Sequence, residues 1–206
     1  SDYIKTKTLA LLEKHSINKN DIYIFVAPDE IETYKDALTE YQIVEGADGI
    51  SKQREAISKY FPRNEFIVSI DDDVSEIYEH GETVTNLLYI CHDIFNHLIA
   101  NDMTLAGCNP CSNTFFAKKT ITTDLKFCCG AFKCFINKPE LETRDYELVE
   151  DYENTLKHYC YGGGILRFNY ITLKVNYNSA KGGLKGVRTL EKKLYEVKKF
   201  TEQYPN

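Results

Sequence analysis

The stretch Phe66-Ile67-Val68-Ser69-Ile70-Asp71-Asp72-Asp73-Val74 joins a short apolar run to three consecutive carboxylates. The run Phe66–Ile70 is typical of a central β-strand that is buried on both faces. Because side chains alternate along an extended backbone, Asp71 and Asp73 are expected to project to the same side. Two carboxylates this close repel each other unless a cation lies between them. The stretch therefore predicts a buried strand that ends at a cation site.

The chemistry of that site follows from its oxygen ligands. Mg²⁺ and Mn²⁺ prefer carboxylate oxygens, and they are usually bound by one or two carboxylates together with substrate phosphates. We expect Asp71 and Asp73 to hold such a metal, which would neutralise a diphosphate leaving group. The alternative is a solvated loop or a helix N-terminus, where aspartates are also common.

Hydrophobic periodicity predicts the other elements. Helices are expected at 4–15, 30–39, 51–60, 84–99, 146–158 and 190–203, and strands at 22–26, 42–44, 66–70 and 165–175. Ser51 is a plausible N-cap for the third helix. Since strands and helices alternate in the first half, we expect an α/β fold with a mostly parallel central sheet flanked by helices. Ligands gather at the carboxyl ends of such strands, here at 27–30 and 71–73.

Length and composition bound the class of protein. The 206 residues suit one domain, and the formal net charge of −6 does not favour a nucleic-acid binder. No apolar run is long enough to span a bilayer, and the charges among the first residues interrupt any secretory leader pattern. The seven cysteines are an odd number, which is typical of reduced thiols in the cytoplasm. Cys108-x-x-Cys111 lacks a second pair with the spacing of a zinc site.

Several segments, in order, resemble the GT-A glycosyltransferases, whose metal motif is a strand followed by D-x-D. Within that class the chain is similar to the TET/JBP-associated group, which is linked to base J and to viral DNA hypermodification. The matching segments are Phe25-Val26, Gly49–Arg54, Ile70–Val74, Val149-Glu150-Asp151-Tyr152, Gly163–Asn169 and Gly182-Gly183-Leu184.

The resemblance implies one GT-A domain over residues 1–206. Its nucleotide-sugar-binding half would cover about 1–103, and its acceptor and catalytic half about 104–206. It further implies a metal-dependent hexosyltransferase, using Mn²⁺ or Mg²⁺, that moves a sugar from a UDP-sugar to a 5-hydroxymethylpyrimidine in DNA with inversion. The expected localisation is cytoplasmic, and it would be the host-cell cytoplasm if the chain is viral.

The resemblance also assigns roles to residues. Asp151 would be the catalytic base, with Glu150 as the second choice, although helix dipoles also favour acids at such positions. The residues expected to contact the nucleotide sugar are Ala27, Asp29, Glu30, Gly49, Arg54, Asp71, Asp72, Lys181, Gly182, Gly183 and Arg188. Arg54 would meet ribose or phosphate, or else form an ordinary surface ion pair. The segment 181–188 would hold the diphosphate, or else be a surface loop.

The sequence is less specific about the residues that would bind the acceptor. Five phenylalanines include candidates for stacking on a flipped base, and three lysines are candidates for phosphate contacts, although core packing explains most of the phenylalanines. They are Phe115, Phe116, Phe127, Phe132 and Phe135, with Lys118, Lys119 and Lys133. Gly162–Gly164 is either an acceptor loop or a helix stop. No histidine follows His158, so the late metal-binding histidine of many GT-A enzymes has no counterpart.

Three other functions remain open at this point. The chain can be a GT-A transferase for a protein or glycan acceptor, which the acidic net charge fits slightly better. It can be a metal-dependent nucleotidyltransferase, which also uses carboxylates at strand ends. It can also be a binding module without activity that kept the fold.

Overall fold

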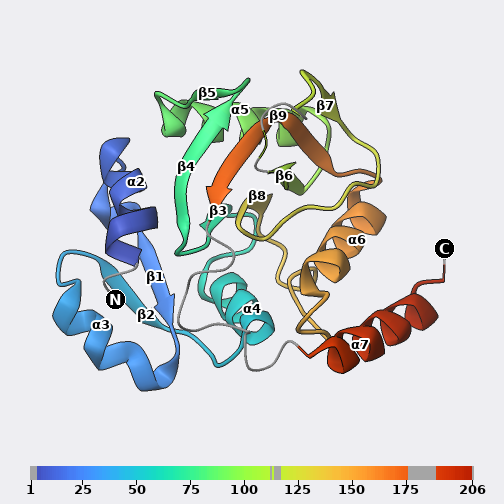
Figure 1. Ribbon diagram of the computed structural model, residues 1–206, viewed down its shortest axis with the longest axis horizontal. Coiled ribbons are helices and arrows are strands. Elements are labelled where there is room, and N and C mark those ends of the chain that lie inside the picture. Colours follow the sequence, from blue (N-terminus) through green and yellow to red (C-terminus); the bar gives the residue numbers. More distant parts are fainter. Residues whose placement is uncertain (1–3, 112, 114–116, 176–188, 206) are drawn as a thin grey trace.

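The computed structural model describes residues 4–111, 113, 117–175 and 189–205, and these form an α/β fold (Figure 1). The helices are α2 (Ala10–Lys14), α3 (Ile31–Ala37), α4 (Ile50–Tyr60), α5 (Leu87–Ala100), α6 (Glu150–Gly162) and α7 (Leu190–Gln203), with short turns η1 (Lys5–Leu9), η2 (Lys19–Asp21) and η3 (Pro28–Glu30). The strands are β1 (Tyr23–Val26), β2 (Gln42–Glu45), β3 (Phe66–Ile70), β4 (Val74–Glu79), β5 (Glu82–Thr83), β6 (Leu105–Asn109), β7 (Ile121–Thr122), β8 (Phe132–Ile136) and β9 (Leu166–Val175).

The central sheet is mixed, so the prediction of a mostly parallel sheet was wrong. Its order is β3-β8-β6-β9-β4-β5, with β7 paired to β9. Within it β6 and β9 run parallel, whereas the other pairs are antiparallel. The alternation of strands and helices that suggested a parallel sheet produces only the separate parallel pair β1–β2, which is joined through α3. Strands from the second half of the chain fill the middle of the main sheet, so both predicted halves share it.

Strand β3 forms at the predicted residues, but it is an edge strand rather than a central one. It pairs only with β8 in the main sheet, and Phe66 is 50% exposed. Only Ile67 and Ser69 are buried, so the strand is not covered on both faces. Val68 and Ile70 are half-buried against the main core, whereas the exposed Phe66 packs on Phe95 with 5.0 Å between ring centroids.

The three aspartates lie in a turn between β3 and β4, not on extended backbone. The expectation that alternation places Asp71 and Asp73 on one side therefore does not apply. The turn is anchored from η1: the buried Thr8 hydroxyl donates to the carbonyl of Asp71 at 2.5 Å. The amide of Val74 donates to the same hydroxyl oxygen at 3.2 Å.

Helices α4 and α6 begin at other residues than those predicted. Helix α4 begins after Gly49, whose φ of 83° is in the left-handed region, so Ser51 is not the N-cap. The Ser51 hydroxyl is buried and donates to the carbonyl of Tyr146 instead. Helix α6 begins at Glu150, four residues later than expected. It ends at Gly162 and is followed by Gly163 with a φ of 68°, which confirms a helix stop in the triple glycine.

The core and the thiols agree with the sequence. Helix α5 packs its apolar face against the sheet, and Leu87, Ile94 and Leu98 are buried there. None of the seven cysteines, all of which lie in the described ranges, forms a disulfide, and Cys91, Cys108, Cys128 and Cys134 are buried. Within the described ranges, no helix has the length and apolar character that crossing a bilayer requires.

Thr8→Val tests the anchor of the aspartate turn. The change removes a buried hydroxyl and leaves the Asp71 carbonyl and the Val74 amide without their partner, which should lower the free energy of unfolding by about 1–3 kcal/mol. Urea denaturation measures it. The exposed Thr39→Val serves as the control and should change stability little. Equal stability of both variants would contradict the anchoring role.

Candidate functional site

The guanidinium of Arg54, on α4, is the centre of the candidate site. It is 6% exposed, and it donates to the Ser69 hydroxyl at 3.0 Å, to Asp71 Oδ1 at 2.5 Å and to the carbonyl of Gly130 at 3.2 Å. The neighbouring carboxylates outweigh burial and hold the pKa of Arg54 above its ordinary value. This excludes the simple surface ion pair; contact with ribose or phosphate stays a prediction.

Gly130 connects Arg54 to the start of α6. Its carbonyl accepts from Arg54, while its amide donates to Asp151 Oδ2 at 3.1 Å. A Cβ atom at this position would lie 2.5 Å from Asp151 Oδ1 and 3.0 Å from Arg54 Nη2. Only glycine leaves room for both side chains. The arrangement therefore brings Asp71 and Asp151, far apart in the sequence, to either side of one arginine and one glycine.

Glu150 and Asp151 share the first turn of α6 and interact through a hydrogen bond between their carboxyl groups. Burial and the charge of Glu150 raise the pKa of Asp151 to about 8. Burial opposes ionisation of Glu150 as well, but Arg54 and the hydrogen bond from Asp151 hold the pKa of Glu150 below its ordinary value. At neutral pH Asp151 therefore carries the proton and Glu150 the charge.

The other two aspartates of the turn are crowded. Loss of hydration, together with the charges of Asp71 and Asp72, raises the pKa of Asp73 to about 6. Loss of hydration, Asp71 and, more weakly, Glu30 raise the pKa of Asp72. A cation would relieve this repulsion. The donor set is made of hard oxygens, as Mg²⁺ or Mn²⁺ requires, although one oxygen of Asp71 is already engaged by Arg54.

No group of three or more metal-ligating side chains occurs among the residues that the structure describes. Asp71 and Asp73 would therefore need oxygens from a substrate or from water to complete a coordination shell. Mg²⁺ is commonly held in this way, by one or two carboxylates and substrate phosphates. The residues present fit a metal that binds together with a phosphorylated ligand.

The other predicted donor residues belong to three segments, of which the structure describes two. Ala27 is half-buried at the end of β1, and Asp29 and Glu30 are exposed in η3. The charge of Glu30 contributes weakly to the raised pKa of Asp72. A Cβ atom at Gly49 would lie 3.7 Å from Glu147 Oε1, an ordinary van der Waals contact. Lys181, Gly182, Gly183 and Arg188 lie outside the described residues.

A buried network of charges behind Glu150 was missed by the sequence analysis. Arg144 donates through Nε to Glu150 at 3.1 Å and through Nη2 to Glu142 at 2.7 Å. Glu142 also meets Lys133 at 3.4 Å and His158 at 2.7 Å. These side chains are all 6% exposed or less. Lys133 is therefore a buried ion partner and not a phosphate contact; its place within the apolar Phe132–Ile136 strand was the available clue.

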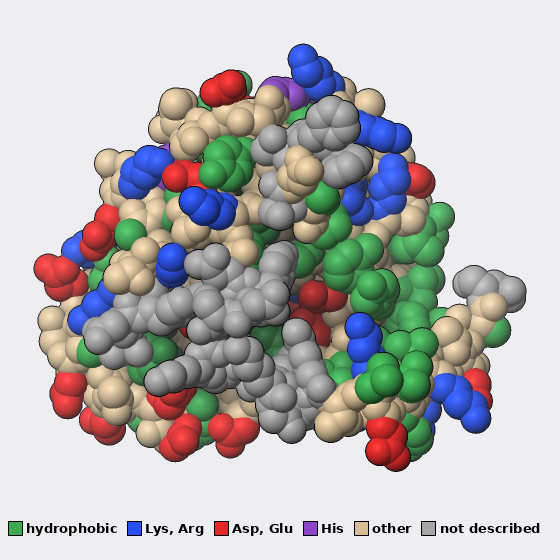
Figure 2. All heavy atoms as spheres, viewed as in Figure 1, with side chains coloured by type: hydrophobic (Ala, Val, Ile, Leu, Met, Phe, Trp, Pro, Cys, Tyr) green, Lys and Arg blue, Asp and Glu red, His purple; other side chains and the backbone are tan. Residues whose placement is uncertain are grey.

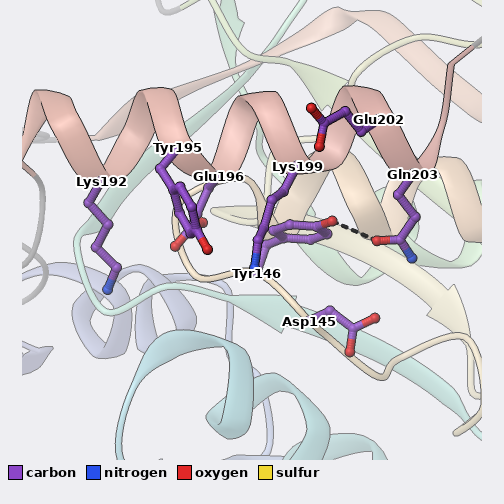
Figure 3. Close-up of a pocket in the computed structure, with 8 residues that line it drawn as sticks. All are labelled: Asp145, Tyr146, Lys192, Tyr195, Glu196, Lys199, Glu202 and Gln203. Atoms are coloured by element: carbon purple, nitrogen blue, oxygen red, sulfur yellow. Dashed lines mark hydrogen bonds between the residues drawn. The ribbon is translucent and has the colours of Figure 1, made fainter.

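The loop before α6 is held by carboxylates from three helices. Glu55 of α4 accepts from the amide of Arg144 at 2.9 Å, and Glu153 of α6 accepts from that of Asp145 at 2.9 Å. Glu196 of α7 accepts from the amide of Leu148 at 2.7 Å. Figure 3 shows Glu196 pointing from α7 into the pocket beside this loop. These bonds fix where α6 starts and hence where Asp151 lies.

Helix α7 contacts the loop with its polar side. In Figure 3 the Tyr146 hydroxyl reaches Gln203, to which it donates at 2.6 Å. The face with Leu190, Leu194 and Val197 is exposed. The helix thus forms at the predicted residues, and it packs against the loop through Glu196, Phe200 and Gln203.

An aromatic pair borders Asp151. Tyr152 is 51% exposed and stacks on Phe127 with 4.4 Å between ring centroids and 30° between planes. Figure 2 shows acidic side chains in a recess over the start of α6, next to an apolar surface. Among the other candidate phenylalanines, Phe132 and Phe135 are buried in the core, so they cannot stack on a ligand. Phe115 and Phe116 lie outside the described residues.

Gly130→Ala tests the close approach at the centre of the site. The added methyl group has to displace Asp151 or Arg54, which should lower the free energy of unfolding by about 1–3 kcal/mol. Thermal or urea unfolding measures the change. Gly162→Ala is the matched control, because a Cβ there meets its nearest neighbour at an ordinary 3.5 Å. A Gly130→Ala protein as stable as the control would refute the tight packing.

Asp151→Asn should make the protein more stable at high pH. The folded-state pKa of about 8 lies above the value near 4 in an unfolded chain. The folded state therefore binds the extra proton, and the wild type loses stability as pH rises from about 4 to 8. Asparagine removes this loss. Unfolding measured from pH 5 to 9 should show a variant advantage that grows up to about pH 8; an advantage that shrinks with pH would contradict the assignment.

Comparison with known proteins adds no family: no protein-family model and no curated protein matches the chain.

Proposed function

We propose that this protein is a metal-dependent glycosyltransferase of the GT-A type. It would move a hexose from a UDP-sugar to a 5-hydroxymethylpyrimidine in DNA, with inversion. The observation that carries the proposal is the joining of Asp71 and Asp151 through Arg54 and Gly130. A transferase needs a place for the leaving diphosphate next to a base for the acceptor, and these two aspartates supply both from separate elements.

Asp71 and Asp73 would hold Mg²⁺ or Mn²⁺. A bound divalent cation would neutralise the diphosphate as the sugar departs. The pKa of Asp73, about 6, has a consequence for this binding, since the metal competes with the proton. Affinity for the cation should therefore rise as pH increases through 6. The Arg54 guanidinium, shared between Asp71 and Gly130, would keep the aspartate turn at a constant position relative to α6.

Asp151 would accept the proton of the acceptor hydroxyl. A general base is most effective when its pKa is near the working pH, because it is then both available and strong. A pKa of about 8 meets this condition better than that of an ordinary aspartate. The hydrogen bond from the amide of Gly130 orients the carboxylate.

The exposed Tyr152 supports an acceptor with a planar ring. It follows Asp151 directly, and a base stacked on the Tyr152–Phe127 pair would lie close to the proposed base. Arg167 donates to the carbonyl of Phe127 at 3.0 Å, and Lys126 is nearby in sequence. Both cations would favour the phosphates of a nucleic acid over an uncharged glycan.

The decisive experiment measures sugar release and transfer. The protein with Mn²⁺ should hydrolyse a UDP-sugar slowly, and it should transfer the sugar to hydroxymethylcytosine or hydroxymethyluracil DNA but not to unmodified DNA. Asp73→Asn should lower transfer at least 100-fold, because a metal ligand is lost. Asp36→Asn, on the exposed side of α3, is the control and should retain activity.

Other outcomes of this experiment would favour a different function. Donor hydrolysis with transfer only to protein or glycan would replace the DNA acceptor. Incorporation of the nucleotide itself would indicate nucleotidyl transfer. Failure to hydrolyse or bind any UDP- or GDP-sugar with Mn²⁺ or Mg²⁺ would leave a binding module and end the enzyme proposal.

A further inference from the structure

Two adjacent carboxyl groups, Glu150 and Asp151, are available as the base, and the buried network behind them distinguishes one from the other. Glu150 is 6% exposed and accepts from Arg144 Nε at 3.1 Å. Within the part of the chain that the structure describes, no cation lies at hydrogen-bond distance from Asp151, which accepts from the neutral amide of Gly130. The two groups thus differ in their partners although they are neighbours in sequence.

Arg144 is itself fixed on every side. Its guanidinium donates to Glu142 at 2.7 Å and to the carbonyls of Leu141 and Thr143 at 3.3 and 3.2 Å. Its amide is held by Glu55. An arginine with this many partners cannot turn away from Glu150 without breaking several buried hydrogen bonds.

The formal charges of the network also indicate that Glu150 is charged and Asp151 is neutral. Its buried cations are Arg54, Lys133 and Arg144, and their anionic partners are Asp71, Glu142 and Glu150. Three positive and three negative charges cancel. His158 lies 2.7 Å from Glu142 through Nε2 and 2.7 Å from the Thr104 hydroxyl through Nδ1, and burial lowers its pKa, which favours a neutral ring. The neighbouring thiol of Cys128 is neutral.

We propose that Arg144 is a positioning residue: it holds Glu150 as the permanently charged member of the pair and leaves Asp151 as the member that exchanges a proton. The network is balanced when Asp151 is neutral, and it carries one uncompensated negative charge when Asp151 is ionised. Loss of a proton from Asp151 is thus made reversible near neutral pH by the groups around it. The catalytic meaning rests on the proposed function, whereas the location of the proton does not.

Two substitutions that should shift the pKa of Asp151 in opposite directions test this proposal. Arg144→Gln removes a cation and should raise the pKa of Asp151 by about 0.5–1 unit. Glu142→Gln removes an anion and should lower it by a similar amount. The measurement is a carbon NMR titration of protein labelled at aspartate Cγ, with the Asp151 signal assigned by its absence in Asp151→Asn. Arg63→Gln, which breaks an exposed ion pair with Glu140, is the matched control and should leave the titration unchanged.

A purely structural role for Arg144 predicts a different pattern. If the two substitutions only loosened the site, the pKa of Asp151 would shift in the same direction in both variants or would not change in either. Each of these results overturns the proposal. If Arg144→Gln does not fold, as judged by circular dichroism, the Glu142→Gln titration alone decides: a downward shift supports the proposal, and an upward or absent shift refutes it.

Activity provides an independent readout. The acidic limb of the kcat/KM pH profile should move with the NMR titration in each variant. The titration needs no substrate, so it separates the two ideas. Shifts of opposite sign without any sugar transfer would retain the inference about Arg144 and reject the glycosyltransferase. Sugar transfer that is unaffected in both variants, together with an unchanged titration of Asp151, would retain the glycosyltransferase and reject the inference about Arg144.

Discussion

The buried guanidinium of Arg54 is the interaction on which the arrangement of this site depends. Removing an arginine from water costs several kcal/mol, which only close partners can offset. Ser69, Asp71 and the carbonyl of Gly130 supply these partners from β3, its following turn and the segment before β8. Each partner must stay in place for the charge to remain solvated, so the arginine joins α4 to the end of the β3–β8 pair, where the amide of Asp71 also donates to the carbonyl of Ala131 at 3.0 Å.

The same charge connects two sets of carboxylates with different tasks. On one side Asp71 leads to Asp72 and Asp73, whose mutual repulsion favours a cation. On the other side Gly130 leads to Asp151, whose pKa of about 8 lies just above neutral pH. A cation bound on the first side would add positive charge near the second and assist ionisation of Asp151. Metal binding and activation of the base would then be linked through Arg54.

Local patterns in the sequence predicted the elements and the most polar positions, because those depend on neighbouring residues. The residues of β3, α4 and α7 and the choice of Asp71 as a candidate came from such patterns, whereas Asp151 was chosen only through the resemblance to GT-A glycosyltransferases. Strand direction and the edge position of β3 did not, since apolar periodicity is the same in parallel and antiparallel strands. Gly130 and Arg144 were also missed, because their roles exist only once segments distant in the chain are brought together.

The charged groups of this site are difficult to explain by stability alone. An aspartate with a pKa of about 8 and a turn of three crowded aspartates both make the folded state less stable at neutral pH than neutral side chains would. Positions where a chain departs from local rules of packing and charge are expected at functional sites. Here two such departures lie on either side of a single arginine. A shared function is a simpler account of that placement than two unrelated costs.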